Sequence, residues 1–263
     1  MTTHTRENAV YQRLRAHLAY LRMPAAAEAL PAVLDAARAE QLSPTALLER
    51  LLGIEATATE ARRLTGRLRF ANLPAPWRLE DFDTDAQPGV DPATLTELGT
   101  LRFLDDATNI LAIGPPGVGK THLAIGLARR AAEAGHRAYF TTAADLVARC
   151  HKAAVEGRWA WMMRFYAGPK LLVIDELGYL PLPTDAAAAL FQVISQRHLK
   201  SSTLITTNRG VTGWGQVLGD TALAAALLDR LLQRAVVLAI DGPSYRMRTH
   251  QARADALRKS THE

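Results

Sequence analysis

The 263-residue sequence contains a single cysteine, Cys150, which excludes an internal disulfide, a cysteine-based zinc site and a CxxC redox motif. Such sparse cysteine usage is typical of a reducing compartment. The N-terminal residues lack the apolar run of a signal peptide, and no stretch approaches the roughly 18 apolar residues of a membrane span. These absences predict a cytoplasmic protein without a membrane partner.

Aromatic residues make up only 6% of the sequence, and no repeat occurs at a solenoid or propeller period. Hydrophobic residues account for 48% and charged residues for 22%, which is ordinary for a globular protein with one large domain or two modest ones. The 31 Lys and Arg residues outnumber the 26 Asp and Glu residues, giving a net charge of +5. This excess of positive charge favours a polyanionic partner.

Apolar spacing predicts a small all-helical domain over residues 1–70. Apolar side chains recur every three or four positions on the first predicted helix, at Val10, Leu14, Leu18 and Leu21. We expect Pro24 to end that helix, because proline cannot continue it. Ser43 followed by Pro44 is typical of an N-cap and first helical position, and predicts the start of a long helix that runs to about residue 70.

Residues 71–108 change in character and are expected to form a linker. They contain four prolines and the acidic run LEDFDTD. From residue 109 to 263 short apolar runs alternate with helical stretches, in the order NILAI, RAYFTT, KLLVIDE, STLITTN and VVLAI, before a short basic tail. This alternation predicts an α/β domain with a parallel sheet covered by flanking helices, and functional residues at the carboxyl ends of its strands.

GPPGVGKT at residues 114–121 matches the phosphate-loop pattern GxxxxGK[ST] between a predicted strand and a predicted helix. Its glycines allow backbone N–H groups to surround phosphate oxygens at the positive end of the helix. We expect Lys120 to reach the β- and γ-phosphates of ATP, and the Thr121 hydroxyl to ligate Mg²⁺. The residues expected to hold the nucleotide are Gly114, Pro115, Pro116, Gly117, Val118, Gly119, Lys120, Thr121 and His122.

Polar residues follow the later apolar runs and complete the predicted chemistry. Asp175 ends a buried run and is expected to hold the Mg²⁺ shell, while the adjacent Glu176 can polarise a water for attack on the γ-phosphorus. Asn208 follows the next run, where its amide could orient the same water. Arg230 and Arg234 lie on a predicted helix before the last run. Each is either a surface arginine or a finger donated to the ATP of a neighbouring subunit.

Several motifs together resemble the IstB family, the AAA+ ATPase helpers of bacterial insertion-sequence transposition, which are similar in turn to the helicase loader DnaC. They are GPPGVGKTHLA, FTTAADLV, DELGYLPL, TTN, AALLDRLL and GPSYRMR, and the resemblance covers essentially the whole chain. It implies a P-loop AAA+ (ASCE) fold, ATP hydrolysis, self-assembly on double-stranded target DNA and delivery of that DNA to a cognate transposase. It also implies Walker A roles for Lys120 and Thr121, Walker B roles for Asp175 and Glu176, sensor roles for Asn208 and Arg246, and a finger role for Arg230.

DNA contacts are predicted separately, because a phosphate loop does not imply them. Residues 151–166 interleave basic and aromatic side chains, which suits phosphate contact and base stacking, although most of the aromatics also fit a face buried against the sheet. A second basic cluster ends the long helix, where a solvated helix end is an equally good interpretation. The candidate DNA contacts are Lys152, Arg158, Arg62, Arg63 and Arg67.

Two other functions remain open from the sequence. One is a DnaC-type loader, which would share the ATPase chemistry but engage a replicative helicase. The other is a nucleotide-gated DNA scaffold in which ATP controls assembly and turnover is incidental. The presence of Glu176 argues against an inactive ATPase.

Overall fold

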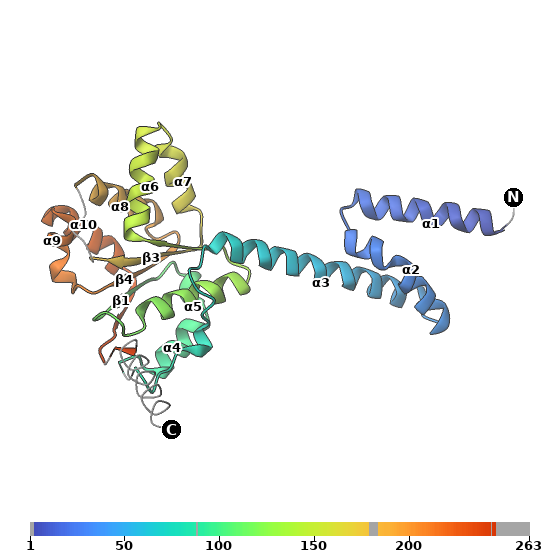
Figure 1. The fold of residues 1–263 in the computed structure, drawn as a ribbon, viewed down its shortest axis with the longest axis horizontal. Helices are drawn as coiled ribbons and strands as arrows, with labels where there is room; N and C mark the ends of the chain where they lie inside the picture. The colour runs from blue at the N-terminus through green and yellow to red at the C-terminus, as the bar shows by residue number, and fades with distance from the viewer. Residues whose placement is uncertain (1–2, 88, 179–183, 243, 246–263) are drawn as a thin grey trace, which may run out of the picture. The chain divides into compact units, whose positions relative to one another are not determined.

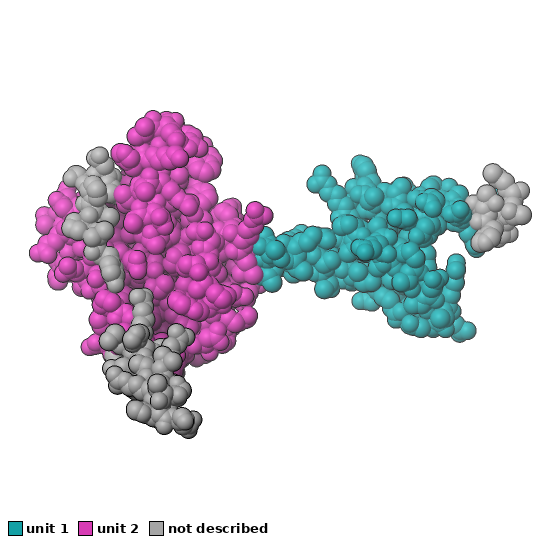
Figure 2. All heavy atoms as spheres, viewed as in Figure 1, with its two compact units in different colours: residues 1–66 teal, residues 67–263 magenta. Residues whose placement is uncertain are grey.

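The computed structural model describes residues 3–87, 89–178, 184–242 and 244–245 (Figure 1). The chain divides into two compact units, Met1–Gly66 and Arg67–Glu263, called unit 1 and unit 2 below (Figure 2). Among the described residues, no helix combines the length and apolar character that a membrane crossing needs.

Unit 1 consists of helices α1 (Thr3–Tyr20) and α2 (Pro24–Ala39) and most of α3 (Pro44–Ala71). Pro24 begins α2 instead of ending α1, because a proline at the first helical position gives up no helical hydrogen bond. Only Leu18 of the predicted apolar face of α1 is buried, together with a small set of side chains from the other two helices, and Val10 is 54% exposed.

Unit 2 is built on a five-stranded sheet in the order β2-β3-β4-β1-β5, with every neighbouring pair parallel. Its strands are β1 (Asn109–Ile113), β2 (Ala138–Thr142), β3 (Leu171–Leu177), β4 (Ser202–Thr207) and β5 (Ala235–Ala239). All five apolar runs identified in the sequence are strands, and the predicted parallel α/β architecture is confirmed.

Helices cover both faces of this sheet (Figure 1). Side chains alternate between the faces along each strand: Ile110 and Ala112 of β1 pack in the cluster with α5 (Lys120–Glu133), and Leu111 packs in the other. The second face is covered by α6 (Ala143–Val155), α7 (Trp159–Ala167), α8 (Thr184–Arg197), α9 (Trp214–Leu218) and α10 (Thr221–Leu232), with a short 3-10 helix η3 (Val211–Gly213) before α9.

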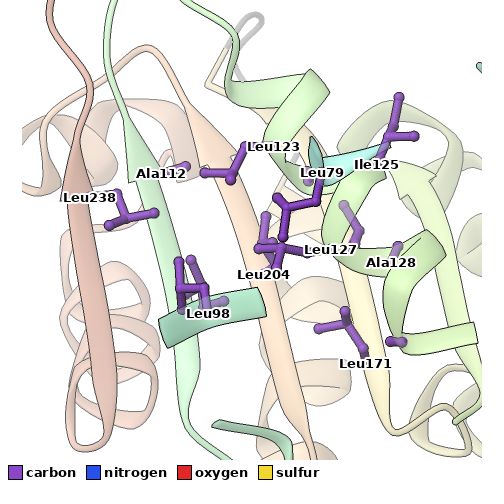
Figure 3. Close-up of a cluster of buried hydrophobic side chains, with 14 of the residues drawn as sticks. Leu79, Leu98, Ala112, Leu123, Ile125, Leu127, Ala128, Leu171, Leu204 and Leu238 are labelled. Carbon is purple, nitrogen blue, oxygen red and sulfur yellow. The ribbon is translucent and has the colours of Figure 1, made fainter. Parts of the chain in front are cut away.

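The expected linker, residues 71–108, is instead folded onto the α5 side of the sheet. It contains the 3-10 helices η1 (Leu79–Asp81) and η2 (Arg102–Leu104) and the helix α4 (Pro92–Gly99). Leu79, Leu98 and Leu104 are buried in the same cluster as α5, and the first two are drawn in Figure 3. The prolines punctuate these short elements, while the apolar residues between them complete the core.

Close approach and polar contacts fix this segment to α5. A Cβ at Gly126 of α5 would lie 2.8 Å from the backbone of Leu79, so glycine is what lets η1 lie directly on the helix. Arg130 of α5 donates to the carbonyl of Gly99 at 2.6 Å and to Glu80 at 2.5 Å. Residues 71–108 are therefore part of unit 2 and can contribute to its site.

A buried arginine stabilises the amino edge of the sheet. Arg197, at the end of α8, is 1% exposed, and burial lowers its pKa to about 9. Its guanidinium donates to the Thr203 hydroxyl at 3.0 Å and to the carbonyls of Tyr166, Pro169 and Ser202 at 2.8, 2.9 and 2.6 Å. The side chain thus ties α8 to β4 and to the connection between α7 and β3.

We predict that Leu79→Ala lowers the free energy of unfolding of unit 2 by about 2–5 kcal/mol, because it removes a core side chain and leaves a cavity. All four tryptophans of the sequence lie in unit 2, so denaturant unfolding followed by tryptophan fluorescence reports on that unit. Leu199→Ala, at a leucine that is 48% exposed, is the matched control and should change little. Equal effects of the two changes on the free energy of unfolding would contradict the assignment of residues 71–108 to the core of unit 2.

Candidate functional site

A cavity of about 380 Å³ opens at the carboxyl edge of the sheet. Its lining comes from three parts of unit 2: the phosphate loop and the start of α5, the ends of β3 and β4, and the segment at residues 77–87. Tyr245, shortly after β5, completes it. This is the edge at which parallel α/β sheets bind their ligands.

The phosphate loop has the geometry that its glycines predict. Gly117 and Gly119 have φ angles of +87° and +95°, and a Cβ at Gly119 would lie 2.9 Å from the ring of Phe82. A Cβ at Gly114 would lie 2.0 Å from the carbonyl oxygen of Ile240. Six of the predicted nucleotide residues line the cavity, namely Pro116, Gly117, Gly119, Lys120, Thr121 and His122, whereas Gly114, Pro115 and Val118 support the loop from outside the lining.

Lys120 begins α5 with its side chain folded over the loop. Its Nζ donates to the carbonyls of Gly114 at 2.8 Å and Pro115 at 2.7 Å, and the side chain lines the cavity. The ammonium group and the N-terminus of α5 place positive charge at the same end of the cavity. This end of the cavity is therefore suited to an anion.

Thr121 and Asp175, the two residues expected to serve Mg²⁺, lie together in the structure. The Thr121 hydroxyl donates to the two carboxylate oxygens of Asp175 at 3.2 and 3.1 Å, and the hydroxyl of Thr206 donates to the same carboxylate. Burial raises the pKa of Asp175 above its ordinary value, and the hydrogen bonds from the two threonines oppose that shift.

The Thr121 hydroxyl and the Asp175 carboxylate fit a shared Mg²⁺ site as oxygen ligands. Mg²⁺ is usually held by one or two protein oxygens together with phosphate and water oxygens. Among the described residues no cluster of three or more His, Cys, Asp or Glu side chains could hold a metal by itself. The donor pair Thr121 and Asp175 therefore suits an ion that arrives with a nucleotide.

Glu176 and Asn208 line the same cavity from neighbouring strands. Glu176 is exposed and has a φ of +61°, a left-handed conformation that costs a non-glycine residue roughly 1–2 kcal/mol. The pairing of β3 with β4 shifts register between Ile174 and Leu177, so this conformation lies within a bulge. The Asn208 amide oxygen is buried without a hydrogen-bond partner in the structure, so it retains the capacity to accept one.

Sequence reasoning named His122 as a nucleotide residue but missed the aromatic group that it forms beside the phosphate loop. The rings of Trp77 and His122 stack with their centroids 5.1 Å apart and an interplanar angle of 16°, and Phe82 meets His122 edge-on at 5.7 Å. His122 is held by the carbonyl of Arg78 at 3.0 Å, and Trp77 remains 42% exposed. This group offers a flat surface on which a nucleobase can stack.

The candidate finger residues lie outside the cavity lining. Arg230 of α10 places its guanidinium 4.6 Å from the ring centroid of Phe191 and donates to the carbonyl of Ala226 at 2.9 Å. Arg234 is exposed and donates to the carbonyl of Asp106 at 2.5 Å. Neither side chain lines the cavity of its own subunit. Arg246, the predicted sensor 2 residue, lies outside the described residues, as does most of the basic tail.

The candidate DNA contacts of unit 2 have partners within the protein. Glu156 forms ion pairs with both Lys152, at 3.9 Å, and Arg158. Lys152 and Arg158 remain largely exposed, so both groups are accessible to solvent. Arg67 donates to the carbonyl of Ala132 at 2.8 Å, which connects the end of α3 to α5.

In unit 1, Arg62 has a specific partner. It bonds to the buried carboxylate of Glu55 at 2.5 Å, which also accepts from the backbone N–H of Ala26 at 3.0 Å. These bonds hold the pKa of Glu55 below its ordinary value. Arg63 lies 4.0 Å from Glu60 and is mostly exposed.

The aromatic residues of α7 divide between core and surface. Tyr166 is buried, and Phe165 packs partly against the same core, as expected for most of this group. Trp161 is 52% exposed and stacks on Phe165 with centroids 5.7 Å apart and an interplanar angle of 20°. Arg164 is also exposed on this short helix.

Comparisons with known proteins show the family of this chain. The family profile described as IstB-like ATP binding protein matches residues 16–253. A protein from Geobacillus stearothermophilus, named as an ATP-binding protein of insertion sequence IS5376, is 39% identical over 237 residues, covering 90% of this chain and 94% of that one. Another from Pseudomonas aeruginosa, named for insertion sequence IS21, is 37% identical over 244 residues, covering 93% of this chain and 92% of its own.

Solved structures are similar in fold. The DnaC helicase loader matches with a TM-score of 0.51 and 24% identity, covering 65% of this chain and 98% of that chain. AMPPCP-bound DnaA from Aquifex aeolicus matches with a TM-score of 0.54 and 20% identity, covering 64% of this chain and 51% of that chain. Unit 2 thus has the P-loop AAA+ fold that the motifs implied.

Replacing Lys120 with alanine should weaken ATP binding by about 1.5–3 kcal/mol, or roughly 10- to 150-fold, because the phosphates lose a charged hydrogen-bond donor. Calorimetric titration with ATP and Mg²⁺ measures the change. Lys170→Ala, at the amino edge of β3, removes the same charge far from the cavity and should leave the affinity unaltered. Parent-like affinity in the Lys120 variant would contradict the assigned phosphate site.

Asp175→Asn should stabilise the nucleotide-free protein at neutral pH. Because the folded-state pKa of Asp175 is raised, the parent protein binds this proton more tightly when folded and loses stability as pH rises from about 4 through that pKa. The advantage of the variant should therefore shrink as pH falls, which denaturant unfolding at several pH values can measure. Asp229→Asn, at an exposed carboxylate, is the control, and a pH-independent difference for Asp175→Asn would contradict the assigned burial effect.

Proposed function

Because the chain belongs to the family of IstB-like ATP binding proteins, we propose that it hydrolyses ATP, assembles on double-stranded target DNA and delivers that DNA to a transposase. The observation that carries the proposal is the meeting of Lys120, Glu176 and Asn208 at one cavity. A protein that only bound ATP would need the first of these but not a carboxylate and an amide at the γ-phosphate end. Relatives named for insertion sequences support the setting in transposition.

In the proposed reaction a water adds to the γ-phosphorus, the bond to the β,γ-bridging oxygen breaks, and ADP and phosphate leave. Glu176 accepts a hydrogen bond from that water and polarises it, and the side chain of Asn208, which lines the same cavity, helps to fix its orientation. Lys120 neutralises charge on the β- and γ-phosphates. When bound, Mg²⁺ held by Thr121 and Asp175 would further neutralise the phosphate oxygens.

The adenine would be bound by the segment at residues 77–87. Trp77, which is 42% exposed, and Phe82 line the cavity that the phosphate loop also lines. Stacking on aromatic rings tolerates any base, so selectivity for adenine would come from polar groups nearby. Gln87 and Asp83 line this part of the cavity and are the candidates.

Self-assembly would complete the site through an arginine from a neighbouring subunit. Arg230 suits this role because its guanidinium is already held against Phe191, so little side-chain freedom is lost when it engages a phosphate. Arg234 remains the alternative, and its contact with the Asp106 carbonyl is at an exposed position. In either case the arginine stabilises charge that develops on the γ-phosphate in the transition state.

The proposed DNA-contacting element of unit 2 is the turn between α6 and α7. Lys152 near the end of α6, Arg158 in the turn and Arg164 on α7 are exposed, and Trp161 of α7 adds an exposed aromatic surface. Phosphates can replace Glu156 as partners of the first two side chains without unfolding either helix. Each contact would be weak by itself, and self-assembly would multiply it along one duplex.

A DnaC-type helicase loader is the second candidate, and the similarity to the DnaC structure supports it only at the level of fold. The insertion-sequence relatives cover nearly the whole chain and favour the transposition role. Parallel binding assays with the purified transposase of the same element and with a replicative helicase separate the two. Measuring whether ATP turnover accompanies assembly distinguishes the proposed hydrolytic role from the nucleotide-gated scaffold.

We expect Glu176→Gln to bind ATP but to lose hydrolysis, since the amide keeps the shape of the side chain but cannot polarise the water as a carboxylate does. Long-lived DNA-bound assemblies should accumulate. Phosphate release at saturating ATP, alongside ATP binding by calorimetry, provides the measurement. Glu133→Gln removes a carboxylate from the far end of α5 and serves as the control. Hydrolysis at the parent rate in the Glu176 variant would exclude it as the activating residue.

DNA binding should depend steeply on salt, because each neutralised phosphate releases condensed counterions. Lys152→Ala should reduce the magnitude of the log–log salt slope by about 0.9 on duplex DNA and should leave sequence preference unaltered. ATP should strengthen the binding through self-assembly. Fluorescence anisotropy over a series of salt concentrations tests this, with Lys170→Ala as the control. An unchanged slope in Lys152→Ala would exclude Lys152 from the DNA interface.

A further inference from the structure

One buried hydroxyl connects the two carboxylate residues of the site. Thr206, on β4, is 1% exposed, and its hydroxyl donates to the carboxylate of Asp175. The same oxygen accepts a hydrogen bond from the backbone N–H of Glu176 at 2.9 Å. Thr206 thus holds the side chain of one residue and the backbone of the next.

The bulge in β3 explains why a side chain is needed at this point. The ladder between β3 and β4 is regular up to the pair Ile174 and Ile205, and resumes with Leu177 opposite Thr207. Between these pairs the N–H of Glu176 is bonded to the Thr206 hydroxyl instead of to a strand carbonyl. The bond fixes Glu176 in its left-handed conformation, in which its exposed side chain lines the cavity.

We propose that Thr206 is the positioning residue that couples the carboxylate of Asp175 to the orientation of Glu176. The inference rests on the proposed hydrolytic function. Thr206 is among the residues that line the cavity, and the role assigned to it acts through Asp175 and Glu176. One oxygen donates to the residue expected to hold the metal and accepts from the residue expected to polarise water. A displacement of Asp175 toward a bound ion is therefore transmitted to the backbone of Glu176 through a single atom.

The chemistry of this role requires a hydroxyl but not a threonine methyl group. Valine has nearly the same shape and loses both hydrogen bonds, leaving the N–H of Glu176 and one carboxylate oxygen without this partner. Serine retains both bonds. Thr203, on the same strand, is equally buried, but its hydroxyl accepts from Arg197 at 3.0 Å at the opposite edge of the sheet, so Thr203→Val is a matched control for the loss of a buried hydroxyl.

The first experiment compares steady-state hydrolysis by Thr206→Val, Thr206→Ser and Thr203→Val in the full-length protein. Thr206→Val should lower kcat by about 10- to 100-fold, the range typical of residues that orient a metal ligand, with little change in KM for ATP. Thr206→Ser should restore most of the parent kcat. Thr203→Val should lose stability but retain kcat.

The second experiment needs neither nucleotide nor metal. Hydrogen exchange at the Glu176 amide, in the protein without ATP or Mg²⁺, should be faster in Thr206→Val and should return to the parent rate in Thr206→Ser. A parent-like kcat in Thr206→Val, equal losses of kcat in Thr206→Val and Thr203→Val, or unchanged exchange at Glu176 would each overturn the inference.

These outcomes are separable from failure of the proposed function. If the parent protein does not hydrolyse ATP, the proposed function fails, and the exchange measurement still decides whether Thr206 fixes Glu176. If the parent hydrolyses ATP and Glu176→Gln does not, but Thr206→Val turns over at the parent rate, only the role of Thr206 is overturned.

Discussion

Burying the carboxylate of Asp175 at the end of β3 costs free energy, and hydrogen bonds from Thr121 and Thr206 offset part of that cost. The two donors come from the start of α5 and the end of β4, so satisfying one carboxylate fixes the relative positions of three elements. The bulge in β3 follows directly after this residue and brings Glu176 to the cavity. The phosphate end of the site is thus organised around a single buried charge that becomes easier to accommodate when a cation approaches.

Sequence patterns were sufficient for the parts of the site that depend on local geometry. The phosphate loop requires glycines at positions with positive φ, and β3 requires an apolar run before Asp175, so both are visible in a single sequence. Thr206 was not visible in this way, because a threonine in a strand is ordinary and its role depends on a register shift in the neighbouring strand. The aromatic group was hidden for a related reason: Trp77 and His122 are 45 residues apart and meet only because residues 71–108 fold back over α5.

The expected linker shows how proline content can mislead. Prolines do interrupt helices, but they do not prevent the residues between them from being buried, and Leu79, Leu98 and Leu104 are as much part of the core as the strands are. The arginine cluster on α3 shows that a charge pattern can mislead as well. Arg62 has its acidic partner, Glu55, seven residues earlier, two turns along the same helix, so a group of arginines near a helix end can have partners that lie further back on that helix.

The segment at residues 77–87 belongs at once to the hydrophobic core and to the wall of the cavity. Any ligand that requires this wall adds to the free energy needed to open it, by about 2.7 kcal/mol when the ligand is present at about 100 times its Kd. The segment begins six residues after α3 ends at Ala71. Occupancy of the cavity therefore raises the free energy of local opening in the chain just beyond α3. The resistance of residues 72–87 to proteolysis becomes a measure of how much nucleotide is bound.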